Sequence, residues 1–252
     1  MENKSLYKNC SEIVLMYHCI YADDPTKSGF QNESAFQYKL NIKMFEEHVK
    51  ALSAVGKPVI FSFDDGGVSF YQVVAPILEK YHQKGLFFIS TKYIGTKGFL
   101  TVKQIQDLHL RGHVIASHSH SHPDNIAALK YNEIVEEWKE SVRILSKICG
   151  ILINVASIPN GYSSRKVIEA AKVAGIRILY TSKPTSKGKR KYDVQLVGRY
   201  VVHRDMSVSY VKSIVCSQWQ RMKLKYRYKS ILIVKAILGS YYHQLKLLII
   251  KK

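Results

Sequence analysis

The amino-acid sequence predicts an α/β fold: a distorted, irregular (β/α) barrel of about seven parallel strands, followed by a basic amphipathic helical tail. Short β-like runs alternate with segments of helical period over the first 206 residues, and most of these runs are continuously hydrophobic. Continuous hydrophobicity is typical of strands buried on both faces of a parallel sheet. Repeated strand–helix units build either a closed barrel or a doubly wound open sheet, and the pattern alone leaves the second as an alternative.

Each predicted element occupies a defined stretch of the chain. Glycine follows four of the helical segments, at Gly85, Gly112, Gly150 and Gly175, where a left-handed helix C-cap favours it. The predicted helices are Ile42–Ala54, Phe70–Lys84, Thr101–Arg111, Asn132–Cys149 and Ser164–Ala174. The predicted strands are Ile13–Tyr17, Val59–Phe63, Leu86–Ser90, His113–Ser117, Asn154–Ile158, Ile176–Thr181 and Gln195–Val202.

Charge divides the chain into two parts. The 252 residues carry 38 Lys and Arg against 19 Asp and Glu, a formal net charge of +19. Ser207 to Lys252 holds ten of these basic residues and no acidic one, so the change of composition predicts a domain over 1–206 and a tail over 207–252. Aromatic and aliphatic residues alternate with Lys and Arg in the tail, which is typical of a helix on an anionic membrane surface.

Composition excludes several classes of protein. A hydrophobic fraction of 46% excludes a disordered polyelectrolyte. Four widely spaced cysteines without a Cys-x-x-Cys pair argue against a disulfide scaffold or a cysteine zinc site and fit a reducing compartment. No segment reads as a signal peptide, and Lys235 and Lys246 interrupt the apolar stretches of the tail before they reach the length of a membrane span. We therefore expect a cytoplasmic protein, peripheral to the inner face of the membrane through its tail.

Two adjacent carboxylates, Asp64 and Asp65, end the hydrophobic strand Val59–Phe63 and precede Gly66 and Gly67. In a parallel α/β domain, functional groups collect at the C-terminal ends of strands. Adjacent side chains diverge along an extended chain, so one carboxylate can bind a cation while the other faces a substrate. An ordinary strand-end turn that caps the following helix is the alternative interpretation.

A histidine-rich segment, Ser117–Pro123, follows another predicted strand. His118 and His122 are four residues apart, so one turn can aim both imidazoles at one ion, whereas His120 is expected to face away. Two histidines and one carboxylate, with open positions for water, form the ligand set of a catalytic zinc or a related divalent metal. A third strand end, Pro159–Gly161, predicts a rigid turn whose backbone N–H groups can face the same site.

Taken in this order, the three segments resemble the motifs of the polysaccharide deacetylases, carbohydrate esterase family 4, which include the chitooligosaccharide deacetylases. Ser62–Gly66 is similar to the family's Thr-Phe-Asp-Asp-Gly, His118–His122 to its His-Ser/Thr-x-x-His and Pro159–Gly161 to its Pro-x-Gly. The strand Leu15–His18 is similar to one with which many relatives begin. The resemblance extends from Ile13 to Ser207 and implies a distorted barrel with fewer than eight repeats that removes N-acetyl groups from a glycan.

The resemblance also implies roles for individual residues. Asp65, His118 and His122 would hold a divalent metal, usually zinc, and Asp64 would be the general base. The turn Pro159, Asn160 and Gly161 would contact the substrate and the oxyanion. So would His18, at the end of the first strand.

Two features depart from the family pattern. The family often has an arginine shortly before Pro-x-Gly that orients the base, and this chain has Ala156, Ser157 and Ile158 there. The family's late Leu-x-His, whose histidine is the general acid, has no clean counterpart, and His203 is the candidate.

Three hypotheses for function follow. The first is a metal-dependent N-deacetylase acting on an N-acetylated glycan, lipid-linked in surface-polysaccharide metabolism. The second is a catalytically inactive carbohydrate-binding relative, suggested by the missing arginine and the unclear general acid. The third is a nucleic-acid-binding protein that uses the basic tail, which is disfavoured because no known reading motif accompanies the charge. The sequence leaves the sugar, the physiological metal and the oligomeric state open.

Overall fold

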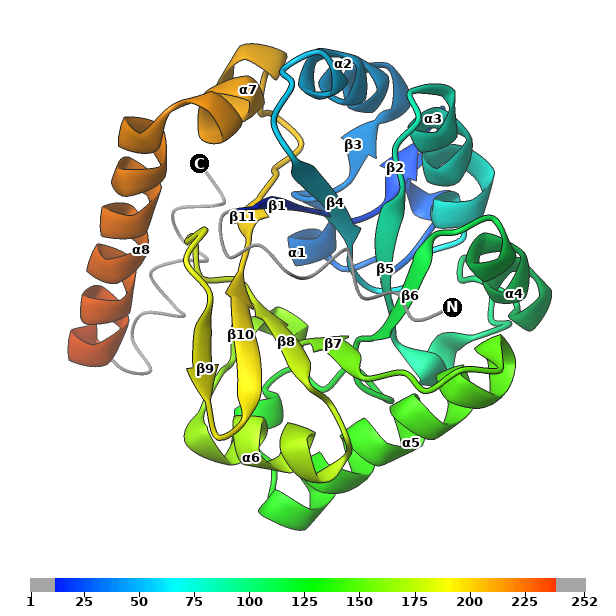
Figure 1. Ribbon diagram of the computed structural model, residues 1–252, viewed down its shortest axis with the longest axis vertical. Coiled ribbons are helices and arrows are strands. Elements are labelled where there is room, and N and C mark those ends of the chain that lie inside the picture. The colour runs from blue at the N-terminus through cyan, green and yellow to red at the C-terminus, as the bar shows by residue number, and fades with distance from the viewer. Residues whose placement is uncertain (1–11, 239–252) are drawn as a thin grey trace.

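A computed structural model describes residues 12–238 and shows a curled, mostly parallel sheet with helices around its outside (Figure 1). Its strands lie in the order β11-β1-β4-β5-β6-β7-β8-β10-β9, and every neighbouring pair is parallel except β10 and β9. The strands are β1 (Ile13–Tyr17), β4 (Val59–Phe63), β5 (Gly85–Ile89), β6 (Val114–Ser117), β7 (Val155–Ser157), β8 (Ile178–Thr181), β9 (Lys189–Lys191), β10 (Val194–Gly198) and β11 (Tyr200–Val201). A separate pair joins β2 (Ile20–Tyr21) to β3 (Leu40–Asn41).

The barrel closes through chain continuity between β10 and β11, the two ends of the run of parallel strands. Strand β10 pairs with β8 and strand β11 pairs with β1, and Arg199 alone separates β10 from β11. The single strand predicted over Gln195–Val202 is therefore two strands, because the run changes partner at Arg199. The predicted irregular barrel is confirmed, and the open-sheet alternative is not the fold.

Helices follow the strands and cover the outside of the sheet (Figure 1). The segment predicted over Phe70–Lys84 begins as a π-helical turn, Phe70–Val74, and ends early at Lys80, so Gly85 starts β5 and caps no helix. Gly112, Gly150 and Gly175 have the positive φ that a C-cap favours. The α-helices are α1 (Glu33–Phe36), α2 (Ile42–Ser53), α3 (Ala75–Lys80), α4 (Val102–Leu110), α5 (Tyr131–Cys149), α6 (Arg165–Val173), α7 (Val208–Cys216) and α8 (Gln218–Leu238).

The largest hydrophobic cluster fixes the strand end that carries the two aspartates. Strands β1 and β5 are buried at every position, as parallel strands covered on both faces are. Phe63, the last residue of β4, is fully buried, and its ring centroid lies 5.4–5.7 Å from those of Tyr17, Phe45, Phe70 and Phe87. Burial of one such ring contributes about 1.5–3 kcal/mol, so the backbone entering Asp64 is held firmly.

The region predicted as a tail begins with a helix that packs on the barrel. Val211, Ile214 and Val215 of α7 lie in the largest hydrophobic cluster, and α7 contacts α2. Arg221 of α8 donates hydrogen bonds to the carbonyls of Ile214 and Val215. The division into 1–206 and 207–252 stays a prediction, and residues 239–252 of the predicted tail lie outside the described residues. Within residues 12–238, no helix combines the length and apolarity that crossing a bilayer requires.

Candidate active site

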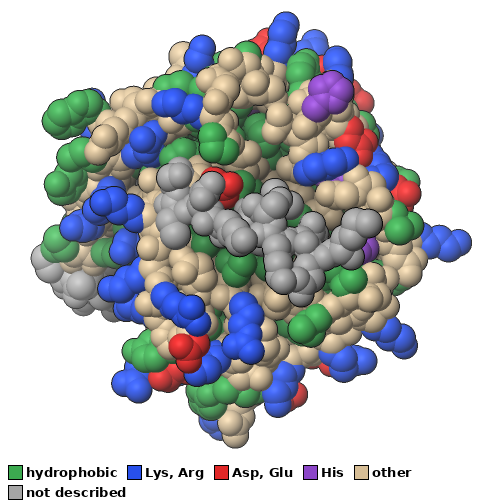
Figure 2. Space-filling model, viewed as in Figure 1, with side chains coloured by type: hydrophobic (Ala, Val, Ile, Leu, Met, Phe, Trp, Pro, Cys, Tyr) green, Lys and Arg blue, Asp and Glu red, His purple; other side chains and the backbone are tan. Residues whose placement is uncertain are grey.

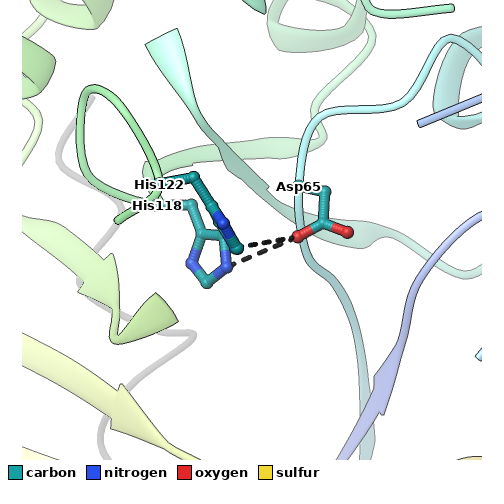
Figure 3. Close-up of side chains that lie close together, drawn as sticks. All are labelled: Asp65, His118 and His122. Carbon is teal, nitrogen blue, oxygen red and sulfur yellow. Dashed lines mark ion pairs between the residues drawn. The ribbon is translucent and has the colours of Figure 1, made fainter. Parts of the chain in front are cut away.

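Three of the predicted residues converge at the C-terminal ends of the parallel strands (Figure 3). Asp65 follows β4, and His118 and His122 come from the loop after β6. Their ligand atoms lie within 4.8 Å of one another, and Nε2 of His118 and of His122 lie 3.6 and 3.4 Å from Oδ1 of Asp65. Asp65 and His118 are buried, and His122 is partly buried.

The chemistry of this trio fits a divalent metal. Nδ1 of His118 lies 3.1 Å from the carbonyl oxygen and 2.6 Å from the hydroxyl of Ser157. A carbonyl only accepts, so Nδ1 carries the hydrogen and the lone pair of Nε2 faces Asp65, the tautomer that a metal ligand needs. A carboxylate and two imidazoles leave coordination positions for water, as catalytic zinc sites do.

Burial and neighbouring charges set the protonation of the trio. Burial alone raises the pKa of Asp65, but a hydrogen bond from His122 and the charges of His18, His122 and His118 hold that pKa well below its usual range. Burial lowers the pKa of His118 to about 4, so this imidazole is neutral near pH 7. The two groups are therefore in the forms that bind a cation.

The motif loops adopt backbone conformations that few side chains accept. Asp65, Ser119, His122 and Asn160 are four of the seven non-glycine residues with positive φ in the described chain. Such conformations persist where the surroundings determine them. Glu137 of α5 is one such constraint, because its carboxylate accepts hydrogen bonds from the backbone N–H groups of residues 120 and 121 and from the Ser121 hydroxyl.

His120 has a different partner from the histidines on either side of it. Its Nδ1 lies 2.9 Å from the Thr91 hydroxyl, and His120 is not part of the Asp65, His118 and His122 cluster. His120 therefore lies apart from the metal-ligand candidates, as expected for a residue that faces away from His118 and His122.

Asp64 forms a buried ion pair with Arg199. The two guanidinium nitrogens of Arg199 lie 2.5 and 2.8 Å from the two carboxylate oxygens, and the side chains are almost fully buried. The guanidinium also lies 5.0 Å from the ring centroid of Phe88. Burial raises the pKa of Asp64, but the charge of Arg199, that of His118 and the hydrogen bonds from Arg199 hold it below its usual value. Asp64 is therefore an ionised carboxylate, and its Oδ2 lies 3.8 Å from Nε2 of His118.

Arg199 is the site residue that the sequence reasoning missed. The family pattern places an arginine before Pro159, where Ser157 of this chain instead contacts Nδ1 of His118. One signal was present, since Arg199 is the only charged residue in the hydrophobic run 194–202. A charge inside a buried strand requires a partner, and the unpartnered candidates were the two strand-end aspartates.

The turn after β7 lies against the loop that carries His122. Pro159 is buried, Asn160 is exposed with φ 53°, and Gly161 has φ 73°. Nδ2 of Asn160 donates to the carbonyl of Asp124, two residues beyond His122, at 3.2 Å. The turn is thus fixed beside the metal-ligand candidates.

The two remaining candidates, His18 and His203, contact the same ring. The centroid of Tyr38 lies 4.7 Å from that of His18 and 5.0 Å from that of His203. His18 directly follows β1, and its charge acts on both Asp64 and Asp65. Its Nδ1 is buried without a hydrogen-bond partner among the described residues, so this atom is available to a ligand.

An irregular (β/α) barrel with these residues at its strand ends defines the class of barrel deacetylases. A family model described as polysaccharide deacetylase matches residues 52–179, about half of the chain, and the chain belongs to this family. The protein YxkH of Bacillus subtilis (strain 168), named for the same family, is 26% identical over 212 residues, which are 76% of this chain and 69% of YxkH.

Solved structures show the same fold. The Streptococcus pyogenes deacetylase PplD in complex with acetate superimposes with a TM-score of 0.68 and 21% identity, over 78% of this chain and 94% of PplD. BC0361, a polysaccharide deacetylase from Bacillus cereus, has a TM-score of 0.68 and 22% identity, over 81% of this chain and 68% of BC0361. The predicted family is confirmed, and with it a deacetylase hydrolase of the glycan-modifying class.

Proposed function

We propose that this protein is a metal-dependent hydrolase that removes N-acetyl groups from an amino-sugar-containing glycan. The observation that carries the proposal is the position of the Asp64–Arg199 pair beside the Asp65, His118 and His122 trio. One carboxylate is free of the metal-ligand set yet held ionised, which is what a general base requires.

The metal in this proposal is zinc, held by Asp65, His118 and His122. When bound, it would polarise the acetamide carbonyl and acidify the attacking water. Asp64 accepts the proton of that water, and Arg199 fixes both carboxylate oxygens so that the base keeps its orientation. In this turn Pro159 has no N–H and the N–H of Gly161 donates to the Ile158 carbonyl, so the backbone N–H of Asn160 is the candidate donor to the developing oxyanion.

The leaving amine needs a proton when its bond to the acetyl carbon breaks. His203 is the candidate from the sequence, and His18 is the second because its charge acts on both aspartates. Tyr38 contacts both rings and keeps the two histidines at one side of the site.

Arg199 also bears on the hypothesis of an inactive carbohydrate-binding relative. That hypothesis relied on the absence of an arginine before Pro159. Arg199, which lies between β10 and β11, instead pairs with the candidate base Asp64. The geometry therefore favours turnover over binding alone.

For the C-terminal region we propose attachment to an anionic membrane surface on the cytoplasmic side, which suits a lipid-linked substrate of surface-polysaccharide metabolism. Hydrophobic and Lys or Arg side chains both lie on the surface along α8, at the left edge of the molecule (Figure 2). Trp219 is 74% exposed, and Tyr226, Leu232 and Ile233 are also exposed. Lys223, Lys225 and Lys229 are exposed on the same helix. Nucleic acid is the less favoured partner of this charge, because the exposed aromatic and aliphatic side chains suit lipid better.

Acetate release tests the enzymatic proposal. The full chain, stripped with a chelator and reloaded with zinc, is expected to release acetate from N-acetylglucosamine oligomers only when reloaded. Asp64→Asn is expected to abolish release, whereas Asp23→Asn, which removes an exposed carboxylate outside the site, retains it. Undiminished release by Asp64→Asn would refute the assignment.

A further inference from the structure

A groove of about 990 Å³ runs between the barrel and the C-terminal helices. Tyr38, Arg199 and His203 line its end at the candidate active site. Leu224, Tyr228 and Ile231 of α8 line its far wall. We call this cavity the α8 groove. Tyr38 and His203 line the groove, and the Tyr38 ring also contacts His18 at the end of β1, so a molecule whose reacting group lies at the candidate active site can continue into the α8 groove.

One part of the α8 groove has an apolar wall that suits a hydrocarbon chain. Val201, Met206, Leu224 and Ile231 contribute aliphatic or thioether surface, which offers sugar hydroxyls no hydrogen bond. Leu224 packs on the largest hydrophobic cluster, so this part of the wall is fixed to the barrel. Most of the rest of the lining is made of polar, charged and tyrosine side chains. An apolar wall beside polar and charged groups is typical of a site for a ligand that has both an apolar and a polar part.

The charge of the α8 groove suits an anion. Arg204 and Arg227 line it, both are exposed, and neither forms an ion pair with an acidic side chain of residues 12–238. Among the described residues, Asp205 is the single acidic one that lines the groove. Arginine without a carboxylate partner is well suited to a phosphate, which it can bind through two hydrogen bonds.

We infer that the α8 groove binds the phosphate and the first isoprene units of a polyprenyl-phosphate-linked sugar, with the N-acetylated sugar at Asp64. The inference rests on the proposed function and names its substrate class. Arg227 and Arg204 meet the phosphate, and Leu224, Tyr228 and Ile231 cover the isoprene units. The exposed residues Leu232–Val234 continue α8 beyond Ile231, so the rest of the chain can pass from the groove into a bilayer on which α8 lies.

Binding of farnesyl phosphate by the full-length chain, measured by calorimetry below its critical micelle concentration, tests the inference. Saturable binding is expected. Farnesol and inorganic phosphate alone are expected to bind at least about tenfold more weakly, because farnesol contacts only the apolar wall and phosphate contacts only the arginines. Arg227→Ala is expected to weaken farnesyl phosphate about 5- to 10-fold, a value kept small because the side chain is exposed.

Two matched substitutions on the same helix serve as controls. Lys225→Ala removes an exposed charge of α8 outside the groove and should leave the affinity within about twofold. Ile231→Asn should weaken binding, whereas Leu232→Asn, at the neighbouring exposed position, should not. Equal effects of Arg227→Ala and Lys225→Ala, or equal affinities for farnesyl phosphate and inorganic phosphate, would overturn the inference.

Acetate release separates this inference from the proposed function. A chain that deacetylates a free N-acetylglucosamine oligomer but does not bind farnesyl phosphate refutes the α8 groove alone. A chain that binds farnesyl phosphate with the expected variant pattern, yet releases acetate from no N-acetylated sugar, refutes the deacetylase and leaves the anionic lipid site standing.

Discussion

Arg199 and Asp64 are 135 residues apart in the sequence, yet they form a bidentate ion pair in the interior of the barrel. Arg199 is the single residue between β10 and β11, where the chain passes from one end of the run of parallel strands to the other. Arg199 therefore both connects the two ends of the barrel and holds the candidate base, Asp64.

Replacing Arg199 is expected to impair both stability and turnover. Arg199→Met leaves the Asp64 carboxylate buried and unpaired, which costs about 3–5 kcal/mol of unfolding free energy. Arg199→Lys keeps the charge but loses the fork that binds two oxygens, so it should fold better and still lose about 10²-fold in kcat. Urea unfolding and the rate of acetate release measure the two effects.

The pH profile distinguishes an altered base from a merely weakened fold. The charge of Arg199 lowers the pKa of Asp64, so the acidic limb of kcat/KM should move to higher pH in Arg199→Met, and by less in Arg199→Lys, which keeps the charge. Arg143→Met is the matched control, because Arg143 also forms a two-pronged pair, with Glu140, but on the surface. It should leave both the unfolding free energy and the pH profile nearly unchanged, because exposed ion pairs contribute little to stability. An unmoved limb in Arg199→Met would show that Arg199 does not act on the base.

Much of the site could be predicted because its residues belong to short local patterns. Asp64 and Asp65 follow a hydrophobic strand directly, and His118 and His122 lie within five residues of each other, so local spacing brings out the candidates. The role of Arg199 depends on which strands become neighbours. Hydrophobic pattern assigns Gln195–Val202 to one strand, and only pairing with β8 on one side and β1 on the other divides it.

Helix boundaries show the same limit. Periodicity located the helix after Gly67, but the π-helical turn and the early end at Lys80 depend on how Phe70 and Leu78 pack. Gly85 looked like a C-cap in the sequence, and its place at the start of β5 follows from pairing with Phe61 of β4. Tertiary contacts decided both cases.

Zinc is expected to stabilise the chelator-treated protein. At a free concentration 100 times Kd, a ligand that binds only the folded state adds about 2.7 kcal/mol, which for a chain of this size raises Tm by on the order of 5–10 °C. His122→Ala should abolish the shift. His120→Ala, in the same loop, should retain it, because His120 contacts Thr91. Loss of the zinc shift in both variants would contradict the assigned ligand set.

Two buried histidines outside the trio are expected to make stability fall in mild acid. Nε2 of His48 donates to the carbonyl of Met206 and its Nδ1 accepts from Tyr17, while Nδ1 of His113 accepts from the backbone N–H of Gly85. Burial lowers the pKa of each from 6.5 to about 4. The unfolded chain therefore takes up protons first, and stability is full above pH 6.5 and falls as the pH drops towards 4.

The size of that effect can be measured on one residue. Because the pKa of each histidine is about 4 in the folded chain, each is expected to lower the unfolding free energy at pH 4 relative to pH 7. His48→Gln should make the unfolding free energy less dependent on pH between 6.5 and 4, whereas His109→Gln, at a partly exposed position on α4, should not. A slope that persists unchanged in His48→Gln would contradict a buried neutral imidazole.

The two histidines beside Tyr38 are expected to differ in their effect on turnover. The general acid should show a fall in kcat of about 10²-fold on substitution by Gln, with little change in KM. His203→Gln showing this loss supports the assignment from the sequence, and His18→Gln showing it transfers the role to His18. Rates of acetate release at several pH values decide, because loss of the acid also removes the basic limb of the profile.

Membrane attachment through α8 is expected to depend on both its charge and its apolar surface. The triple substitution of Lys223, Lys225 and Lys229 by Gln should weaken binding to phosphatidylglycerol vesicles about 100-fold, since each lysine near an anionic surface contributes about 1 kcal/mol. The same change at Lys50, Lys103 and Lys147, exposed on the barrel helices, is the matched control. Trp219→Ser should weaken binding, and Leu110→Ser, which removes an exposed apolar side chain from α4, should not. Equal losses in the two lysine triples would point to net charge alone, and tighter binding to duplex DNA than to vesicles would favour nucleic acid as the partner.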